Sequence, residues 1–273
     1  MKRICYWLML SGIGLLVSGA VTGLAQEASE IPHTTIEMSA DGFNGPEEMP
    51  EGAVLITFEN NMEMPAVPSI ARLNEGVTID EVSEALHPSA EVSLISDLGG
   101  TMIMPGITFD VTFYFVPGTY VVYNLFDREK FLSFTVVDGE GDGAVGPDAD
   151  VEIGLVDFAY NAPISVPAGS RTIHLENQGT QFHMMLIFRL DDSLTVHKVH
   201  ELLLQESDSE ELPEGVEEVA SWFPMSAGEQ AWINLDLEAG TYLLFCSLPD
   251  LNGSGHLHAE LGMRQFFIVT DSE

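Results

Sequence analysis

Short runs of alternating apolar and polar residues make up most of the chain between residues 31 and 138. They are rich in β-branched and aromatic residues, and Gly, Pro, Asn and Asp separate them, which is typical of short β-strands joined by turns. Five stretches have this character: residues 35–43, 52–60, 108–116, 119–126 and 131–138. The pattern predicts an all-β domain over residues 31–138.

The same pattern recurs over residues 151–271. Residues 58–60 (FEN) align with residues 175–177 (LEN), and residues 117–120 (PGTY) align with residues 239–242 (AGTY). Two matches in the same order indicate an internal duplication. Many short strands in each repeat predict two tandem β-sandwich domains. Residues 139–150 are acidic, rich in Gly and without large apolar side chains, so they are interpreted as a linker.

Each repeat also contains one stretch that favours a short helix. In the first repeat, Thr78 precedes residues 79–86 as a helix N-cap, and Glu81 follows three positions later, which is the pattern of a capping box. In the second repeat, Thr195 precedes residues 196–204, where apolar positions recur at helical spacing. The fold class is therefore all-β, with one short helix inserted in each sandwich.

The first 25 residues have the character of a signal peptide. Lys2 and Arg3 precede an apolar run over residues 4–16, and small residues continue to Ala25. This pattern predicts cleavage after Ala25 and export to the periplasm or the extracellular space. The alternative is that the segment stays attached as a membrane anchor.

The charge of the chain is strongly negative, with 9 basic against 43 acidic residues. This balance argues against nucleic-acid binding and against anionic membrane surfaces, because both carry negative charge. A basic electron-transfer partner would be attracted. A solvated surface suited to a salty habitat is the simpler interpretation, and both stay open.

The predicted signal segment contains Cys5, so the mature chain keeps one cysteine, Cys246. A lone thiol in an oxidising compartment persists when it is buried or bound to a metal. Cys246 ends the apolar run 242–246, and a loop with His256, His258 and Met263 follows before the next apolar run. Thiol, imidazole and thioether form the soft ligand set that suits copper, and His183 is the best candidate for a further ligand.

These residues carry a family resemblance. A cysteine at the end of a strand, followed by His258 and by Met263 five positions later, resembles the blue-copper (cupredoxin) proteins, which include plastocyanin and azurin. His183 downstream of Asn177 resembles the family's first histidine ligand. The resemblance covers residues 151–271 and departs from the family in the long loop 247–257, which keeps His256 open as an alternative to His258.

The resemblance implies a Greek-key β-sandwich and a single type 1 copper ion. It implies equatorial ligation by His183, Cys246 and His258, weak axial ligation by Met263, and one-electron transfer as the function.

The first repeat lacks the predicted ligands. Ala66 aligns with His183 and Asn124 aligns with Cys246, and the loop that carries His258 and Met263 is missing because the first repeat is shorter there. The strand pattern persists without these residues, so their joint presence in the second repeat favours a metal site over a role in folding. The first domain is therefore expected to be a degenerate copy without copper ligands.

Three functions compete for this pattern: an exported electron carrier, a copper storage or delivery protein, and a metal-free interaction module. A multicopper oxidase would carry a His-Cys-His motif, whereas Phe245 and Ser247 flank Cys246, so the chain is not expected to be an enzyme. Zinc would fit Cys-His-His, but Met is a poor zinc ligand. Four methionines of the first domain suggest Cu(I) binding, but core packing is the preferred interpretation; they are Met62, Met64, Met102 and Met104.

Overall fold

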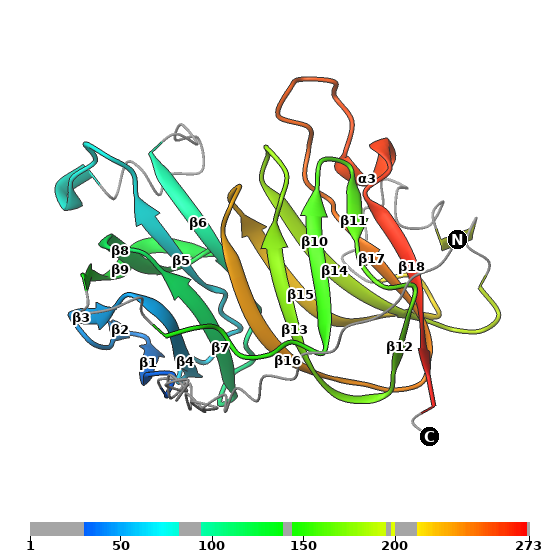
Figure 1. The fold of residues 1–273 in the computed structure, drawn as a ribbon, viewed down its shortest axis with the longest axis horizontal. Coiled ribbons are helices and arrows are strands. Elements are labelled where there is room, and N and C mark those ends of the chain that lie inside the picture. The colour runs from blue at the N-terminus through cyan, green and yellow to red at the C-terminus, as the bar shows by residue number, and fades with distance from the viewer. Residues whose placement is uncertain (1–29, 82–93, 139–143, 195–197, 200–211, 272–273) are drawn as a thin grey trace, which may run out of the picture.

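The computed structural model describes residues 30–81, 94–138, 144–194, 198–199 and 212–271 (Figure 1). The predicted signal segment, most of both predicted insertion helices and residues 139–143 of the linker lie outside these residues. The strands of the first domain are β1 (His33–Ser39), β2 (Gly42–Asn44), β3 (Glu48–Pro50), β4 (Gly52–Asn60), β5 (Pro68–Leu73), β6 (Ile95–Gly100), β7 (Thr108–Phe115), β8 (Gly118–Asn124) and β9 (Asp127–Val137).

The strands of the second domain are β10 (Val151–Val156), β11 (Ala159–Asn161), β12 (Ser165–Pro167), β13 (Gly169–Asn177), β14 (His183–Leu190), β15 (Val216–Met225), β16 (Gln230–Leu237), β17 (Gly240–Phe245) and β18 (Arg264–Thr270). Two short helical segments are also described, η1 (Ile79–Glu81) and α3 (His258–Leu261). Among the described residues, no helix is long and apolar enough to cross a membrane.

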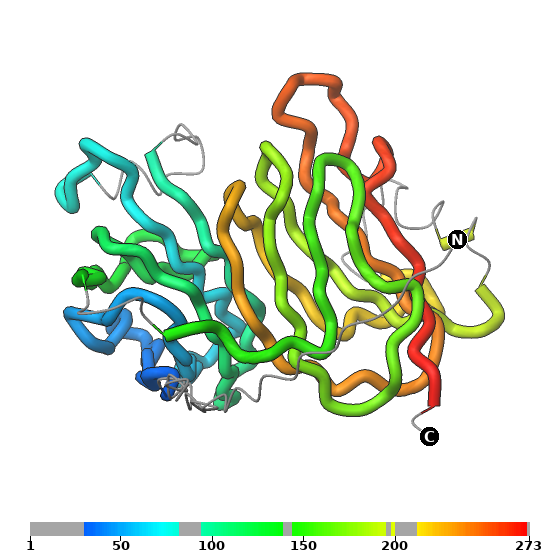
Figure 2. The backbone as a smooth tube through the Cα atoms, viewed as in Figure 1, coloured from blue at the N-terminus to red at the C-terminus, as the bar shows by residue number. Residues whose placement is uncertain are grey.

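The strands form three sheets. One sheet of eight strands, in the order β11-β10-β13-β16-β7-β4-β1-β2, runs through both domains. A five-stranded sheet, β12-β18-β17-β14-β15, belongs to the second domain, and another, β3-β9-β8-β5-β6, belongs to the first. Each domain is thus a two-layer β-sandwich, and Figures 1 and 2 show the two sandwiches side by side. The predicted all-β fold with two tandem sandwiches is confirmed.

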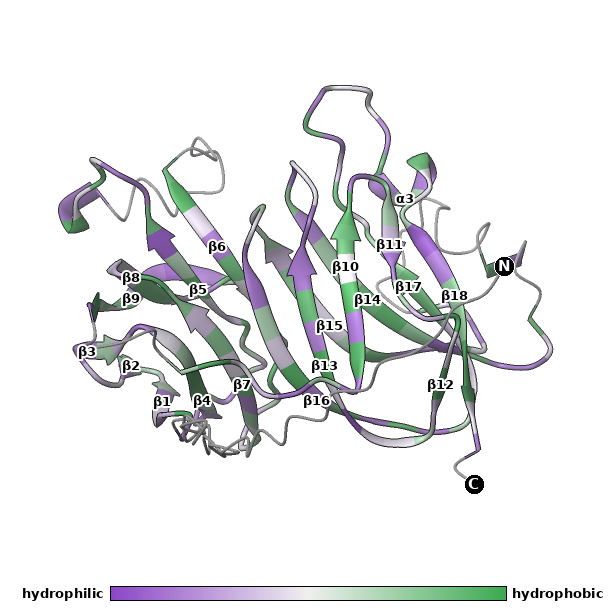
Figure 3. Ribbon diagram, in the orientation of Figure 1, coloured by the Kyte–Doolittle hydropathy of each residue, from purple (hydrophilic) through white to green (hydrophobic). Residues whose placement is uncertain are grey.

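Alternation along the strands builds the core. In β4, Val54, Ile56 and Phe58 are buried, whereas Leu55 and Thr57 between them are only partly covered. Side chains of successive strand residues point to opposite faces, so one face fills the sandwich and the other faces outward. Figure 3 shows the same change between hydrophobic and hydrophilic residues along the other strands.

The internal duplication is visible in side-chain contacts. The Asn60 amide nitrogen donates hydrogen bonds to two loop carbonyls at 3.0 and 2.7 Å, and Asn177 makes the same two contacts at 2.9 and 2.7 Å. Tyr120 and Tyr242 each donate a hydroxyl hydrogen bond to the carbonyl four residues earlier, at 2.9 and 2.8 Å. Asn60 and Asn177, and likewise Tyr120 and Tyr242, are aligned in the sequence repeat. The aligned residues therefore make the same hydrogen bonds in both sandwiches.

The two domains share one sheet and one core. β7 pairs antiparallel with β16, and Val111 lies opposite Ile233. These two residues also occupy the same position in the aligned repeats. The domains are therefore related by an approximate two-fold axis through this pair. Behind it, Phe113 contacts Trp222 with ring centroids 5.9 Å apart, and a single cluster of buried apolar residues extends through both sandwiches. The apolar core is therefore continuous across the boundary between the domains.

The described part of the linker is packed against the domains. The Ala144 carbonyl accepts a hydrogen bond from the Ala53 amide at 2.7 Å. Gly146 lies so close to the Trp232 indole that an added Cβ would meet the ring at 2.3 Å. Glycine is required there because any side chain would overlap the indole.

Half of the predicted capping box is present among the described residues. The Thr78 amide donates to the Glu81 carboxylate at 2.9 Å, which is the half of the motif in which Glu reaches back to the N-cap. Lys198 and Val199, from the second predicted helix, are helical. Helix α3 was not expected from the sequence, and it begins at a predicted metal ligand.

Candidate metal centre

Three of the four predicted ligands lie at neighbouring strand ends, and the fourth begins a short helix. His183 begins β14, Cys246 follows β17, His258 begins α3 and Met263 immediately precedes β18. Because β14 pairs with β17 and β17 pairs with β18, these chain positions meet at one end of the second sandwich. All four residues are fully buried.

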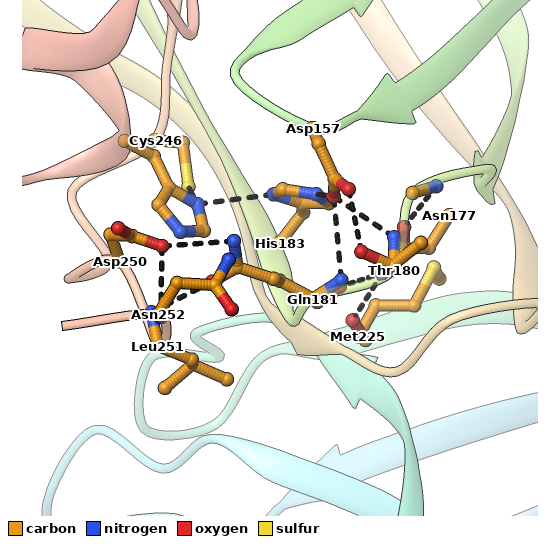
Figure 4. A network of polar contacts seen from close by, with 12 residues as sticks. Asp157, Asn177, Thr180, Gln181, His183, Met225, Cys246, Asp250, Leu251 and Asn252 are labelled. Atoms are coloured by element: carbon orange, nitrogen blue, oxygen red, sulfur yellow. Dashed lines mark hydrogen bonds and ion pairs between the residues drawn. The ribbon is translucent and has the colours of Figure 1, made fainter. Parts of the chain in front are cut away.

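Three ligand atoms converge. His183 Nδ1 lies 3.1 Å from His258 Nδ1, and Cys246 Sγ lies 3.5 Å from the same His258 nitrogen. The three ligand atoms all lie within 4.8 Å of one another. Figure 4 shows the His183 imidazole and the Cys246 side chain facing the same space. Among the described residues, this is the one group of three or more His, Cys, Asp or Glu side chains that could hold a metal ion.

Met263 is held beside the cluster by its backbone. Its amide donates to the His258 carbonyl at 2.8 Å, and its carbonyl accepts from the Cys246 amide at 3.2 Å. Cys246 is also bonded to the helix that carries His258, because the Ala259 amide donates to the Cys246 carbonyl at 3.0 Å. The positions of the thiol, the second imidazole and the thioether residue are therefore coupled through one set of main-chain hydrogen bonds.

Asp157 orients His183. Its Oδ1 lies 2.9 Å from His183 Nε2. An ionised carboxylate only accepts hydrogen bonds, so Nε2 carries the proton and Nδ1 presents its lone pair to the centre. Asp157 is itself fixed by the Thr180 hydroxyl and amide, at 2.6 and 2.9 Å, and by the Gln181 amide at 3.3 Å (Figure 4). Such carboxylate–histidine pairs commonly fix a ligand's orientation and increase its basicity.

The turn between β10 and β11 carries this carboxylate. The next residue, Phe158, has a φ of 62°, in the left-handed region that a bulky residue rarely occupies. Its ring contacts His258 edge-on, with centroids 5.2 Å apart. On the other side, Gly262 has a φ of 127° and no Cβ, which leaves room for the Phe158 carbonyl. The turn thus touches both histidines, one through Asp157 and one through Phe158.

Sequence reasoning missed Asp157. In the repeat alignment it lies opposite Ala40, so the carboxylate is missing from the domain that also lacks the ligands. The strand registers support this alignment, because Ile36 pairs with Phe58 as Ile153 pairs with Leu175. Extending the comparison of the two repeats to this turn would have identified Asp157.

The long loop 247–257 is anchored beside the centre. Gln181 clamps it, donating from Nε2 to Asp250 at 3.0 Å and accepting from the Leu251 amide at 2.7 Å. The His258 amide donates to the Leu248 carbonyl at 2.8 Å. His258 Nε2 is buried and has no hydrogen-bond partner among the described residues. The loop that departs from the family pattern is thus bonded both to Gln181, two residues before His183, and to His258.

The structure places His258, and not His256, in the cluster. The His256 side chain is 58% exposed, and its Nδ1 lies 3.6 Å from the Glu260 carboxylate. Asn177 lies one loop away and donates to the carbonyls of Gln181 and Met225. Because Asn60 makes the same contacts in the domain without ligands, Asn177 shapes the loop before His183 and has no special link to the metal.

Burial sets the protonation of the ligands. Burial lowers the pKa of His183, and Asp157 opposes this shift. Burial and the neighbouring His183 lower the pKa of His258. Burial raises the pKa of the Cys246 thiol. At neutral pH both imidazoles are neutral and the thiol keeps its proton, so metal binding displaces that proton.

Asp157 stays ionised. Burial opposes its ionisation, but hydrogen bonds from the Thr180 hydroxyl and amide, from His183 and from the Gln181 amide outweigh that effect and lower the pKa of the carboxyl. A negative charge therefore faces the protonated nitrogen of His183 at neutral pH.

The donor set fits copper. Two imidazole nitrogens and one thiolate, with a thioether residue beside them, are the ligands of a type 1 copper site. The buried cluster supports a single ion of this type. In the first domain the equivalent place is filled differently, because Asn124 accepts hydrogen bonds there from the amides of Val67 and Phe126 at 3.1 and 3.2 Å.

Comparisons with known proteins give similar structures but no close relative. No protein-family model matches the chain, and no curated protein matches it. Similar solved structures include reduced auracyanin from Roseiflexus castenholzii, with 22% identity over 47% of this chain and 100% of that chain and a TM-score of 0.31. Azurin from Methylomonas sp. strain J is 19% identical over 45% of this chain and 96% of that chain, with a TM-score of 0.28.

A copper-containing nitrite reductase from Thermus scotoductus is 14% identical over 89% of this chain and 62% of that chain, with a TM-score of 0.25. The similar structures thus include cupredoxins, the family that the ligand spacing resembles, and copper enzymes. Likeness at this level says nothing about function, which has to be argued from the site.

Proposed function

We propose that this protein is an exported type 1 copper protein that carries single electrons. The observation that supports this function is the convergence of His183 Nδ1, Cys246 Sγ and His258 Nδ1 within 4.8 Å in a fully buried cluster. Met263 is tied by its backbone to two of these ligands and would supply the weak axial thioether. A copper ion bound there supplies a Cu(II)/Cu(I) couple.

The protein's contribution is to hold the ligands still. Each ligand sits at the end of a paired strand or at the start of a helix that is bonded to one, so the ligand positions are fixed by the sandwich. His183 is held by Asp157, and His258 is packed against Phe158 and bonded through its amide to Leu248 of the loop 247–257. A rigid, dry site changes little between two oxidation states, which favours fast electron transfer over binding and release.

The surroundings support a carrier more than an enzyme. Phe245 and Ser247 flank Cys246, so the chain lacks the His-Cys-His motif that links a blue copper to a catalytic centre in oxidases. The chain is acidic, with 43 acidic residues, and a redox partner protein with a basic docking surface would be steered toward it. The signal-like first 25 residues support export to the periplasm or the extracellular space.

The experiment follows copper through a redox cycle. The mature protein is loaded with one equivalent of Cu(II) and reduced by a basic c-type cytochrome in the presence of a Cu(I) chelator. We expect reversible one-electron reduction with copper retained, and a rate that falls as ionic strength rises. An uncharged small-molecule reductant serves as the control and should show no such dependence. Release of Cu(I) to the chelator as fast as reduction would instead support storage or delivery.

A further inference from the structure

A cleft of about 280 Å³ lies between the two domains, and each domain contributes five of its lining residues. Its wall includes Phe182, which immediately precedes His183. It also includes Leu248, two positions after Cys246. Small-molecule sites are common at domain boundaries, where an apolar lining carries a few polar groups. This cleft has such a lining, because one of its sides is polar and the other is apolar.

The first domain supplies the polar side of the cleft. The Tyr123 hydroxyl donates to Asp97 Oδ1 at 2.8 Å, and Tyr123 is buried. The Asp97 amide donates to Ser226 Oγ of the second domain at 2.8 Å, and the Asp97 carbonyl accepts from the Ser226 amide at 2.7 Å. The carboxyl is therefore fixed at the domain boundary before a ligand arrives, which favours binding.

One oxygen of the Asp97 carboxyl is left for a ligand. Only Oδ1 accepts a side-chain hydrogen bond from the described residues. Oδ2 is not among the buried side-chain atoms that lack a partner, so it faces open space, and the open space that Asp97 lines is this cleft. A carboxyl oxygen in that position can accept a hydrogen bond from a ligand hydroxyl.

The sandwich fold does not require polar residues at this place. Ser69, which also lines the cleft, pairs with Tyr123 across neighbouring strands. In the second domain the aligned pair is Leu186 with Phe245. The first domain thus has two hydroxyl groups where its repeat has two apolar side chains. Burying a hydroxyl costs free energy unless it is hydrogen-bonded, so stability alone does not favour this exchange.

The second domain supplies the apolar side of the cleft. Its five lining residues all have apolar side chains: Phe182, Pro224, Leu248, Pro249 and Leu251. Leu251 is 53% exposed although the Gln181 side chain holds its amide at 2.7 Å, so an apolar side chain is kept in contact with solvent here. A cavity of about 150 Å³ is enough for benzene, so the larger cleft has room for a substituted aromatic ring.

The charges around the cleft favour a neutral ligand. Arg128 lines the cleft with its guanidinium carbon 5.7 Å from the centroid of the Tyr123 ring, so a cation would be repelled. An anion would meet Asp97 and the strong negative charge of the chain. Burial raises the pKa of Asp97 to about 7, although the Tyr123 hydroxyl and Arg128 oppose this shift. The carboxyl is therefore only partly charged at neutral pH, which suits a neutral hydroxyl.

We propose that this cleft binds a small phenol, with the aromatic ring against Phe182 and Leu248 and the hydroxyl group donating to Asp97 Oδ2. The ligand would contact both domains, and two of the residues in contact with it adjoin predicted metal ligands in the chain. Binding requires no metal, so the site does not depend on the function proposed for the cluster at Cys246.

The test titrates the mature protein, without added metal, with p-cresol and with toluene and follows binding by NMR. Both compounds have a methyl-substituted ring, and toluene lacks the hydroxyl group. We expect one saturable site that binds p-cresol about 10-fold more tightly than toluene, because toluene leaves the carboxyl oxygen without a partner. Benzoate and benzylamine, an anion and a cation of similar size, should both bind more weakly than p-cresol.

The decisive variant combines Asp97→Leu with Tyr123→Phe. It replaces both hydrogen-bond partners by apolar groups of similar shape, an exchange that can be nearly neutral for stability. In this variant p-cresol should lose its advantage, and the two compounds should bind within about 2-fold of each other. Asp110→Leu with Thr57→Val is the matched control, because the Thr57 hydroxyl donates to Asp110 at 2.6 Å on an exposed part of the same domain. The control should keep the preference of the parent protein.

The proposal would be overturned if p-cresol showed no saturable binding, or if the parent and the decisive variant preferred it equally. Leu251→Ala covers the case in which the decisive variant fails to fold, since Leu251 is more than half exposed and its amide stays bonded to Gln181. This variant should bind p-cresol and toluene more weakly by a similar factor, because both rings lose the same apolar contact. Unchanged affinity for both compounds would also count against the site.

Discussion

Replacing Asp157 with asparagine removes the charge that faces His183 and leaves an oxygen in the same place. The Asp157 carboxylate lies 2.9 Å from His183 Nε2 and is held there by Thr180 and Gln181. Without the charge, the His183 imidazole donates less electron density from Nδ1, and an asparagine NH₂ group can take the place of the acceptor. Both effects weaken the ligand and loosen its orientation.

The magnitude follows from comparable partners of metal-bound histidines. Loss of such a partner costs about 10- to 100-fold in metal affinity, which corresponds to about 1.4–2.7 kcal/mol. The better donor stabilises the more highly charged ion, so Cu(II) should lose more than Cu(I). We therefore expect Asp157→Asn to weaken Cu(II) binding within this range and to raise the reduction potential.

The assay is competition for Cu(II) against a chelator of known affinity, together with voltammetry of the loaded protein. Asp250→Asn is the charge-matched control, because Asp250 also acts on the centre through its charge but makes no hydrogen bond to a ligand histidine. Its effect should be clearly smaller. Equal shifts in the two variants would refute the reasoning, since the effect would then be that of net charge alone.

Three further predictions follow from the same geometry. Binding of Cu(II) at pH 7 should release about one proton, because burial keeps the Cys246 thiol protonated and both histidines neutral in the metal-free protein; calorimetry in buffers of different ionisation enthalpy measures this, and no release would contradict it. Trp222→Ala should lower the free energy of unfolding by about 3–5 kcal/mol in urea, because Trp222 is fully buried against the other domain; a change under 1 kcal/mol, at about the level of a surface substitution, would argue against the shared core. A fragment without residues 26–145 should keep the four predicted ligands assembled but should unfold at a lower urea concentration than the whole chain, because β16 loses its partner β7. Equal urea midpoints of unfolding would mean that the stability of the second domain does not depend on the first.

Much of the fold could be predicted from the sequence because its signals are local. Alternating strands and the matched PGTY and AGTY turns predicted two sandwiches, and ligand chemistry together with the resemblance to blue-copper proteins pointed to His183, Cys246, His258 and Met263. The pairing of β7 with β16 could not be predicted in this way, because a strand that pairs across domains has the same alternating sequence pattern as a strand that pairs within a domain. Four-residue α3 is too short for helical periodicity to show.

The rest of the site depended on contacts between distant residues. Asp157 is 26 positions from His183, and among 43 acidic residues only the comparison of the two repeats distinguishes it. The prediction of core packing was wrong for Met64, Met102 and Met104, which are 68%, 39% and 54% exposed. Methionine is a common core residue, and the loops that carry these three lie outside the strands, where alternation is not a reliable guide to burial. The sequence favoured His258 over His256 only through the family spacing; in the structure, His256 of the loop 247–257, which Gln181 anchors through Asp250 and Leu251, is exposed.

The most direct test of the central claim is a visible absorption spectrum during titration of the mature protein with Cu(II), beside the Cys246→Ser variant. The account predicts an intense thiolate-to-copper band that saturates at one equivalent in the parent protein and is missing in the variant. Weak or absent absorption in the parent, without tight copper binding, would contradict the assignment of a type 1 copper centre to this cluster.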